Sequence, residues 1–197
     1  MATKTSGIIR VSDNIKQVKK ELKRAQKKKI PEATVEALNN TAFKIKNALS
    51  VQTQKRLDRP TKFTYKSGFG VGKANLKHLD SAVFIRDIQA KYLQWVIDGG
   101  HNTNEGKGIV QPTPNQRLNT YGNIPGLKKT FWNNKVFRKI GSGTGVYNKK
   151  GELLAVIKQS VNYTKKLLPF FKIGEGVASN VLAKELRLAI KKEFRKR

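Results

Sequence analysis

Cysteine is absent from this chain of 197 residues, and acidic residues, histidine and long apolar runs are scarce. Without cysteine there are no disulfides, thiolate nucleophiles or cysteine zinc sites. The two histidines, His78 and His101, have no partner at metal-ligand spacing and no carboxylate pair beside them. No apolar run approaches the roughly 18 residues needed to cross a bilayer. We therefore expect a protein that is cytoplasmic or part of something assembled in the cytoplasm, that is not an enzyme and that has no metal site or cofactor.

The few carboxylates are scattered, and this leaves one catalytic alternative open. Two of them, brought together by folding, would bind Mg²⁺ as in a nuclease, although nothing in their spacing requires it. The candidates in the middle of the chain are Asp58, Asp80, Asp87, Asp98 and Glu105.

Residues 67–73, SGFGVGK, have the glycines and the lysine of a phosphate-binding loop but not its spacing. Ser67 stands where the first glycine is required, and Ala74 stands where a Ser or Thr would hold magnesium. The strand-then-helix context of a dinucleotide site is also missing. The segment predicts a bent or bulged hairpin instead.

Positive charge is the most informative feature of the composition. Forty-one Lys and Arg face 13 Asp and Glu, which gives a formal net charge of +28. A compact domain with this charge repels itself, so we expect a polyanionic or acidic partner. Nucleic acid and an acidic protein surface fit equally well, and nucleic-acid binding would weaken as salt rises.

Much of this charge falls on two predicted helices. Residues 16–29 carry eight basic groups and a single acid, Glu21, whereas a solvated helix normally mixes both signs. We predict that both helices contact an anionic partner. The predicted contact residues are Lys16, Lys19, Lys20, Lys23, Arg24, Lys27 and Lys28 in the first helix and Lys184, Arg187, Lys191, Lys192 and Arg195 in the last.

Hydrophobic spacing and turn residues predict one α+β domain, with two N-terminal helices, a central and mostly antiparallel β-sheet with a long loop, and a C-terminal helix. Ser12 and Asp13 are expected to cap the first helix, and Pro31 to begin the second. The predicted segments are a flexible lead or short strand over 1–12, a helical pair over 13–58, strands and a short helix over 61–100, an extended docking loop over 101–130, strands over 131–172 and a basic helix over 175–197.

Within these segments, shorter elements are predicted. Strands are expected over 63–65, 81–85, 136–140, 146–147 and 153–157, with a hairpin turn over 148–151 and a helix over 90–97. Val181, Leu182, Leu186, Ala189 and Ile190 are expected to face inward from the last helix.

Four short stretches carry a resemblance to a known group of proteins: Ala37–Phe43 (ALNNTAF), Asp58–Thr61 (DRPT), Ala90–Leu93 (AKYL) and Gly99–Gly100. Together they resemble the minor tail or virion structural proteins of tailed phages. The overall plan is similar to the family of the lambda-type minor tail protein Z and, more distantly, to tail-completion proteins.

The resemblance implies a ring- or collar-forming virion component of the tail or head–tail junction, assembled in the host cytoplasm. Its partners would be portal, adaptor, tail or neck subunits, further copies of itself, and the backbone of genome DNA, with no membrane or small-molecule substrate. It implies structural roles for Asn39, Asn40, Arg59 and Pro60 and no catalytic residue. The alternative is a free, sequence-independent nucleic-acid-binding protein.

Overall fold

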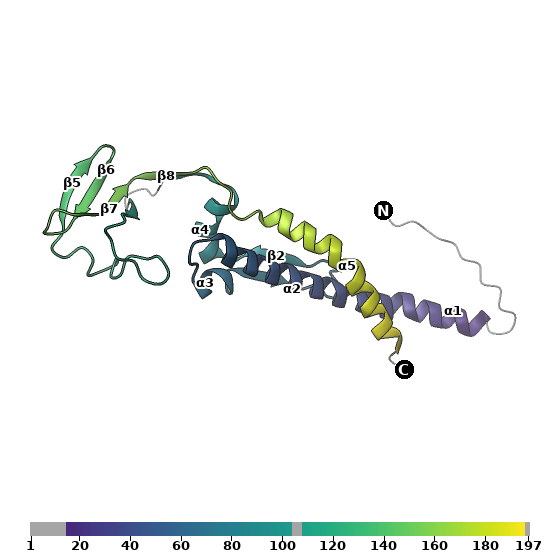
Figure 1. Cartoon of the computed structure of the whole chain (residues 1–197). Coiled ribbons are helices and arrows are strands. Elements are labelled where there is room, and N and C mark those ends of the chain that lie inside the picture. Colours follow the sequence, from purple (N-terminus) through teal and green to yellow (C-terminus); the bar gives the residue numbers. More distant parts are fainter. Residues whose placement is uncertain (1–14, 104–107, 196–197) are drawn as a thin grey trace. The chain divides into compact units, whose positions relative to one another are not determined.

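The computed structural model describes residues 15–103 and 108–195, so the predictions for the N-terminal lead, for the caps Ser12 and Asp13 and for Glu105 lie outside the described residues. It shows the predicted mixed α+β class (Figure 1). The helices are α1 (Ile15–Arg24), a π-helix (Ala25–Lys29), α2 (Ile30–Arg56), α3 (Lys62–Tyr65), α4 (Asp87–Ile97) and α5 (Phe170–Arg195). The strands are β1 (Phe69–Gly72), β2 (Ala82–Ile85), β3 (Gly100–Thr103), β4 (Ile109–Pro112), β5 (Val136–Ile140), β6 (Gly143–Tyr147), β7 (Leu153–Lys158) and β8 (Ser160–Tyr163).

The chain divides into two compact units. Of the described residues, unit 1 comprises 15–43, 72–82 and 178–195, and unit 2 comprises 44–71, 83–103 and 108–177. Helices α2 and α5 each contribute one part to unit 1 and the other part to unit 2.

The two predicted N-terminal helices are joined by a π-helical turn, and Pro31 supplies the reason. Proline has no N–H to donate to the carbonyl four residues earlier, so a regular α-helix is disturbed just before it. The chain winds more widely there, and the Ile30 N–H bonds to the Ala25 carbonyl five residues back. The helix therefore continues through the predicted break.

Unit 1 is held together where α2 packs against α5. Ala33, Ala37 and Ala189 are almost fully buried, with Leu186 and Ile190 packed around them. Alanines leave little side chain between two helices, so the backbones approach closely. The core of unit 1 is accordingly a narrow seam of small residues.

The first core of unit 2 gathers residues from five helices and strands. Leu49, Phe69, Leu93, Ile97 and Leu168 are buried together, and the Phe170 ring stacks on Phe69 at 6.2 Å between centroids. The predicted helix over 90–97 is confirmed as the C-terminal part of α4. The predicted strand over 63–65 is wrong, because these residues form α3.

Helix α3 is explained by its cap. The Thr61 hydroxyl accepts a hydrogen bond from the Thr64 N–H at 3.2 Å, which supplies a helix start directly after Pro60. The alternation of Phe63 and Tyr65 suggested a strand, but a local cap decides the conformation of so short a segment.

The second core of unit 2 lies against a four-stranded antiparallel sheet, in the order β4-β7-β6-β5. Strand β5 is confirmed with the predicted bounds, and β6 and β7 each include a predicted strand. The predicted turn over 148–151 joins them, with the Asn148 N–H bonded to the Glu152 carbonyl at 3.1 Å. Val146 and Ala155 are fully buried on one face of this sheet.

Residues 101–130 differ from the predicted extended loop. They contain β4 and most of β3, which pairs antiparallel with β8, and Ile124 in this stretch is buried in the second core. Strand β8 lies in the segment 131–172, for which strands were predicted, but it was not among the individual strands expected there. The paired residues of β3 and β8 are far apart in the chain, from Gly100 with Tyr163 to Thr103 with Ser160. Local sequence patterns do not show which distant segments pair.

Candidate anion-binding surface

The predicted contact residues of the first helix lie on α1 and on the π-helix that follows it. They recur at spacings of three and four residues, which places them along one side of a helix. Those whose side chains are described, Lys19, Lys20, Lys23, Arg24, Lys27 and Lys28, are all exposed. Glu21, the acid in this stretch, is exposed as well. The surface of this segment thus carries a large excess of positive charge.

The predicted contact residues of the last helix lie in the part of α5 that belongs to unit 1. Lys184, Arg187, Lys191, Lys192 and Arg195 are all exposed. Lys192 pairs with Glu36 of α2 at 2.7 Å. Unit 1 therefore brings both predicted basic segments into one compact body.

Two of the three acids of α5, both in the part that belongs to unit 1, are buried, whereas Glu175 in unit 2 is exposed. Glu185 and Glu193 are only 6% and 5% exposed, and with Ala189 between them they form a stripe at four-residue spacing that is buried against α2. The Asn40 amide donates to the Glu185 carboxylate at 3.1 Å. Because Glu185 and Glu193 are buried and the cations are exposed, the solvent-facing side of α5 within unit 1 is more positive than its composition suggests.

Apolar periodicity did not find these buried acids. Leu182, expected to face inward, is 37% exposed. The signal that could have found them is their spacing, because positions 185, 189 and 193 lie four residues apart and so on one side of the helix. A glutamate can be buried on that side when a polar partner such as Asn40 bonds to it, as Asn40 does to Glu185.

The motif residues Asn39 and Asn40 hold unit 1 together. The Asn39 side chain accepts the Ala74 N–H at 2.8 Å and donates to the Ala74 carbonyl at 3.1 Å, so one amide satisfies both backbone groups of a buried residue. Asn40 bonds to Glu185 on α5. The two neighbours thereby connect α2 to the segment after β1 and to α5.

Arg59 and Pro60 lie just after the end of α2, in unit 2. Arg59 has a φ of 45°, in the left-handed region that ends helices, and its guanidinium bonds to the Asp58 carboxylate at 3.0 Å. This hydrogen bond holds the pKa of the exposed Asp58 carboxyl below its ordinary value. The following chain enters α3 and not the strand that was expected.

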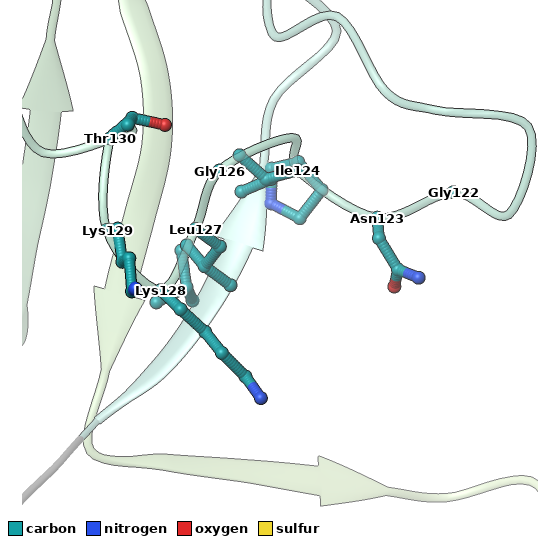
Figure 2. Close-up of a pocket in the computed structure, with 10 residues that line it drawn as sticks. Gly122, Asn123, Ile124, Gly126, Leu127, Lys128, Lys129 and Thr130 are labelled. Atoms are coloured by element: carbon teal, nitrogen blue, oxygen red, sulfur yellow. The ribbon is translucent and has the colours of Figure 1, made fainter.

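A pocket of about 770 Å³ opens in unit 2 between β4 and residues 122–130 (Figure 2). Its walls include Val110, Ile124 and Leu127, and in Figure 2 the Lys128 side chain points away from the loop. Gly126 has a φ of 68°, and a Cβ there would lie 2.1 Å from the Thr130 hydroxyl oxygen, so this loop conformation requires glycine.

Two smaller hollows of unit 2 share the exposed ring of Phe84. One, of about 360 Å³, is lined by Phe63 and Ile88, and the other, of about 280 Å³, by Phe171. These four side chains are between 49% and 70% exposed. They form an apolar surface that sequence periodicity did not reveal.

Segments considered for other chemistry have structural explanations. In the 67–73 segment, the Phe84 ring covers Gly70 so closely that a Cβ would lie 2.5 Å from it. His101 pairs with Asn162 across β3 and β8. Among the residues described, no group of three or more His, Cys, Asp or Glu side chains is arranged to hold a metal ion. No described helix is both long and apolar enough to span a bilayer.

The aromatic side chains of unit 2 differ in burial. Phe69 and Phe131 are buried in the two cores of unit 2, whereas Phe63 and Tyr121 are about half exposed. Trp132 lies between two rings, edge-on to Phe131 at 4.8 Å and stacked on Phe137 at 6.2 Å.

Comparisons of this chain with protein-family models, curated proteins and solved structures find no match.

Proposed function

We propose that this protein is a structural component of a tailed-phage particle, at the tail or the head–tail junction, and that unit 1 binds a polyanionic neighbour there. The observation that carries the proposal is the sorting of charge in unit 1. Exposed cations line α1, the π-helix and α5, while Glu185 and Glu193 are buried between helices. A surface of one sign attracts the opposite sign over several ångströms.

The phage assignment rests on the sequence resemblance, and the contacts of its motif residues support it. Asn39 and Asn40 make hydrogen bonds that connect α2 to two other segments. These contacts fit the structural roles that the resemblance implies for Asn39 and Asn40. Exposed Arg59 pairs with its neighbour Asp58, which is also a packing and turn arrangement and not a catalytic one.

The neighbour has two chemical forms in such a particle: the backbone of genome DNA or an acidic face of an adjoining subunit, including a ring of further copies. Binding of DNA predicts counterion release and a steep loss of affinity with salt. A free, sequence-independent nucleic-acid-binding protein would have the same basic surface. What separates the two functions is whether the protein is incorporated into particles.

The experiment has two parts, and the first is mass spectrometry of particles purified from the phage that encodes this chain. We expect the protein in the particles at a reproducible copy number relative to the other tail proteins. Its absence from purified particles would contradict the structural role, and strong DNA binding by the free chain would then favour the alternative.

The second part locates the anion-binding surface. Binding of a labelled 30-base-pair duplex is measured at several salt concentrations for the wild type and for the triple variant Lys19→Gln, Lys20→Gln, Lys23→Gln. The slope of log K against log salt is negative, and each lysine–phosphate pair that the variant removes should make it shallower by about 0.9. The matched control removes the same charge from unit 2 with Lys149→Gln, Lys150→Gln and Lys158→Gln, and equal effects of both variants would argue against a specific surface on unit 1.

A further inference from the structure

Strand β5 is one of the two outer strands of its sheet, at the end opposite β4, and it is exposed on both faces. It pairs with β6, from Val136 opposite Tyr147 to Ile140 opposite Gly143, and within the described residues no strand pairs with its other edge. All five of its residues are exposed, including Val136 at 42%, Phe137 at 50% and Ile140 at 38%. The unpaired edge is a template for another strand.

Strand β5 lacks two of the devices that usually protect an edge strand, proline and a bulge, but it carries the charged side chains of Arg138 and Lys139. Strand β5 contains no proline and no glycine, and its register with β6 is continuous over all five pairs, whereas the one irregularity of this sheet lies between β6 and β7. Two of its side chains are held by contacts within the sheet and the preceding loop: Trp132 stacks on Phe137, and the Arg138 guanidinium lies over the Tyr147 ring at 5.5 Å. The strand is therefore preformed, free of bulges in its pairing with β6 and partly apolar.

The backbone groups that would accept a new strand follow from the turn. A hairpin closed by a two-residue turn has a hydrogen-bonded pair next to that turn, which here is Ile140 and Gly143. Bonding alternates along the strand, so the backbone N–H and C=O groups of Phe137 and Lys139 point to the outer edge. Two residues thus offer four backbone groups to a partner strand.

Charge decides which partner fits this edge. Arg138 and Lys139 lie on β5, and Lys135 precedes it. From residue 106 to residue 174 the chain has one acid, Glu152, and its carboxylate is bonded to Asn148 in the β6–β7 turn. A second copy pairing through the same edge would place cations opposite cations, which is destabilising.

We propose that the outer edge of β5 binds an extended, acidic segment of a different protein by strand addition. The added segment places Asp or Glu side chains beside Arg138 and Lys139, one on each face, and apolar side chains beside Val136, Phe137 and Ile140. Backbone hydrogen bonds to Phe137 and Lys139 supply affinity, and the charges select the partner. This site lies in unit 2 and is distinct from the basic helices of unit 1.

The test uses the full chain and a labelled ten-residue peptide with Val-Glu-Glu-Val-Val at its centre, because Arg138 and Lys139 lie on opposite faces of β5 and need consecutive acids. A peptide with Lys in place of both Glu serves for comparison. We expect the acidic peptide to bind in fluorescence anisotropy, and the basic peptide not to bind. Hydrogen exchange of the complex should show new protection at the amides of Phe137 and Lys139 and little change at Arg138, whose amide already faces β6.

Two kinds of variant separate the edge from general charge. Lys139→Pro removes an outward N–H, and Arg138→Glu with Lys139→Glu reverses the charge; each should weaken binding by at least about tenfold, within the range expected when cross-strand pairs are removed. Lys149→Glu with Lys150→Glu makes the same change of charge in the β6–β7 turn and should change binding by less than about threefold.

Several results would overturn the proposal. They are no binding of the acidic peptide to the wild type, equal binding of the basic peptide, equal loss in the turn control, and a wild-type dimer in sedimentation that Lys139→Pro dissolves. Hydrogen exchange on the wild type decides the case if a β5 variant fails to fold. The Lys19, Lys20 and Lys23 variant should keep peptide binding, so failure of either proposal leaves the other intact.

Discussion

The side chain of Asn39 forms two hydrogen bonds with the backbone of Ala74, accepting from its N–H at 2.8 Å and donating to its carbonyl at 3.1 Å. Ala74 is 5% exposed, so neither of its backbone groups has ready access to water as a substitute. The Asn39 amide therefore bonds to both backbone groups of Ala74, as the backbone of a neighbouring strand would, and it connects α2 with the segment that follows β1.

Asn39→Ala should destabilise the protein by about 1–3 kcal/mol, because it leaves two buried backbone groups without partners. Asn47→Ala is the matched control, since Asn47 is an exposed residue of the same helix and its replacement should change stability by less than about 0.5 kcal/mol. Urea unfolding followed by circular dichroism measures both. Equal stabilities of the two variants would show that the Asn39 contact is not formed in solution.

The alanine seam between α2 and α5 predicts a strong size limit. Ala37→Leu introduces a branched side chain where the alanine is fully buried against α5, and it should cost about 1–3 kcal/mol or more. Ala183→Leu makes the same change at an exposed position of α5 and should be nearly neutral. Thermal unfolding distinguishes these outcomes, and an Ala37→Leu variant as stable as the wild type would mean that the helices are not in close contact.

Asn40 and Glu185 should be energetically coupled. The Asn40 amide donates to a carboxylate that is 6% exposed, and a hydrogen bond to a charged group contributes about 1.5–3 kcal/mol. Asn40→Ala should therefore cost more in the wild type than in a Glu185→Gln background. A double-mutant cycle by urea unfolding measures the coupling, and additive effects would contradict it.

The Asp58 carboxyl should titrate below the ordinary pKa of aspartate, because Arg59 donates hydrogen bonds to it and places a positive charge beside it. Its pKa is lower in the folded state than in the unfolded state, so its contribution to stability is present above the unfolded pKa and is lost as pH falls through the folded pKa. An NMR titration should show the low pKa, and Arg59→Ala should return it toward the ordinary value. An unchanged pKa in that variant would remove Arg59 as the cause.

Local sequence signals predicted those elements that depend on nearby residues. The change of helical winding falls just before Pro31, the predicted turn over 148–151 joins β6 to β7, and β5 has the predicted bounds. The short helix α3 shows the limit, because the Thr61 cap outweighs the alternating pattern of Phe63 and Tyr65. Where one hydrogen bond determines a four-residue element, residue propensities predict poorly.

Local sequence patterns did not predict the contacts between residues that are far apart in the chain. The bonds of Asn39 to Ala74 and of Asn40 to Glu185 span 35 and 145 residues, and the pairing of β3 with β8 also joins segments far apart in the chain. The basic residues of the candidate surface were predictable from composition alone. The burial of Glu193 was not, because it depends on how α5 is rotated against α2.

The most direct test of the proposed function is lysine footprinting of purified particles by mass spectrometry, compared with the free chain. The account predicts that the protein is present in the particles and that Lys19, Lys20, Lys23, Lys184 and Lys191 react with an amine-specific reagent far more slowly there than in the free chain. Absence of the protein from the particles, or equal reactivity of these lysines in both states, would contradict it.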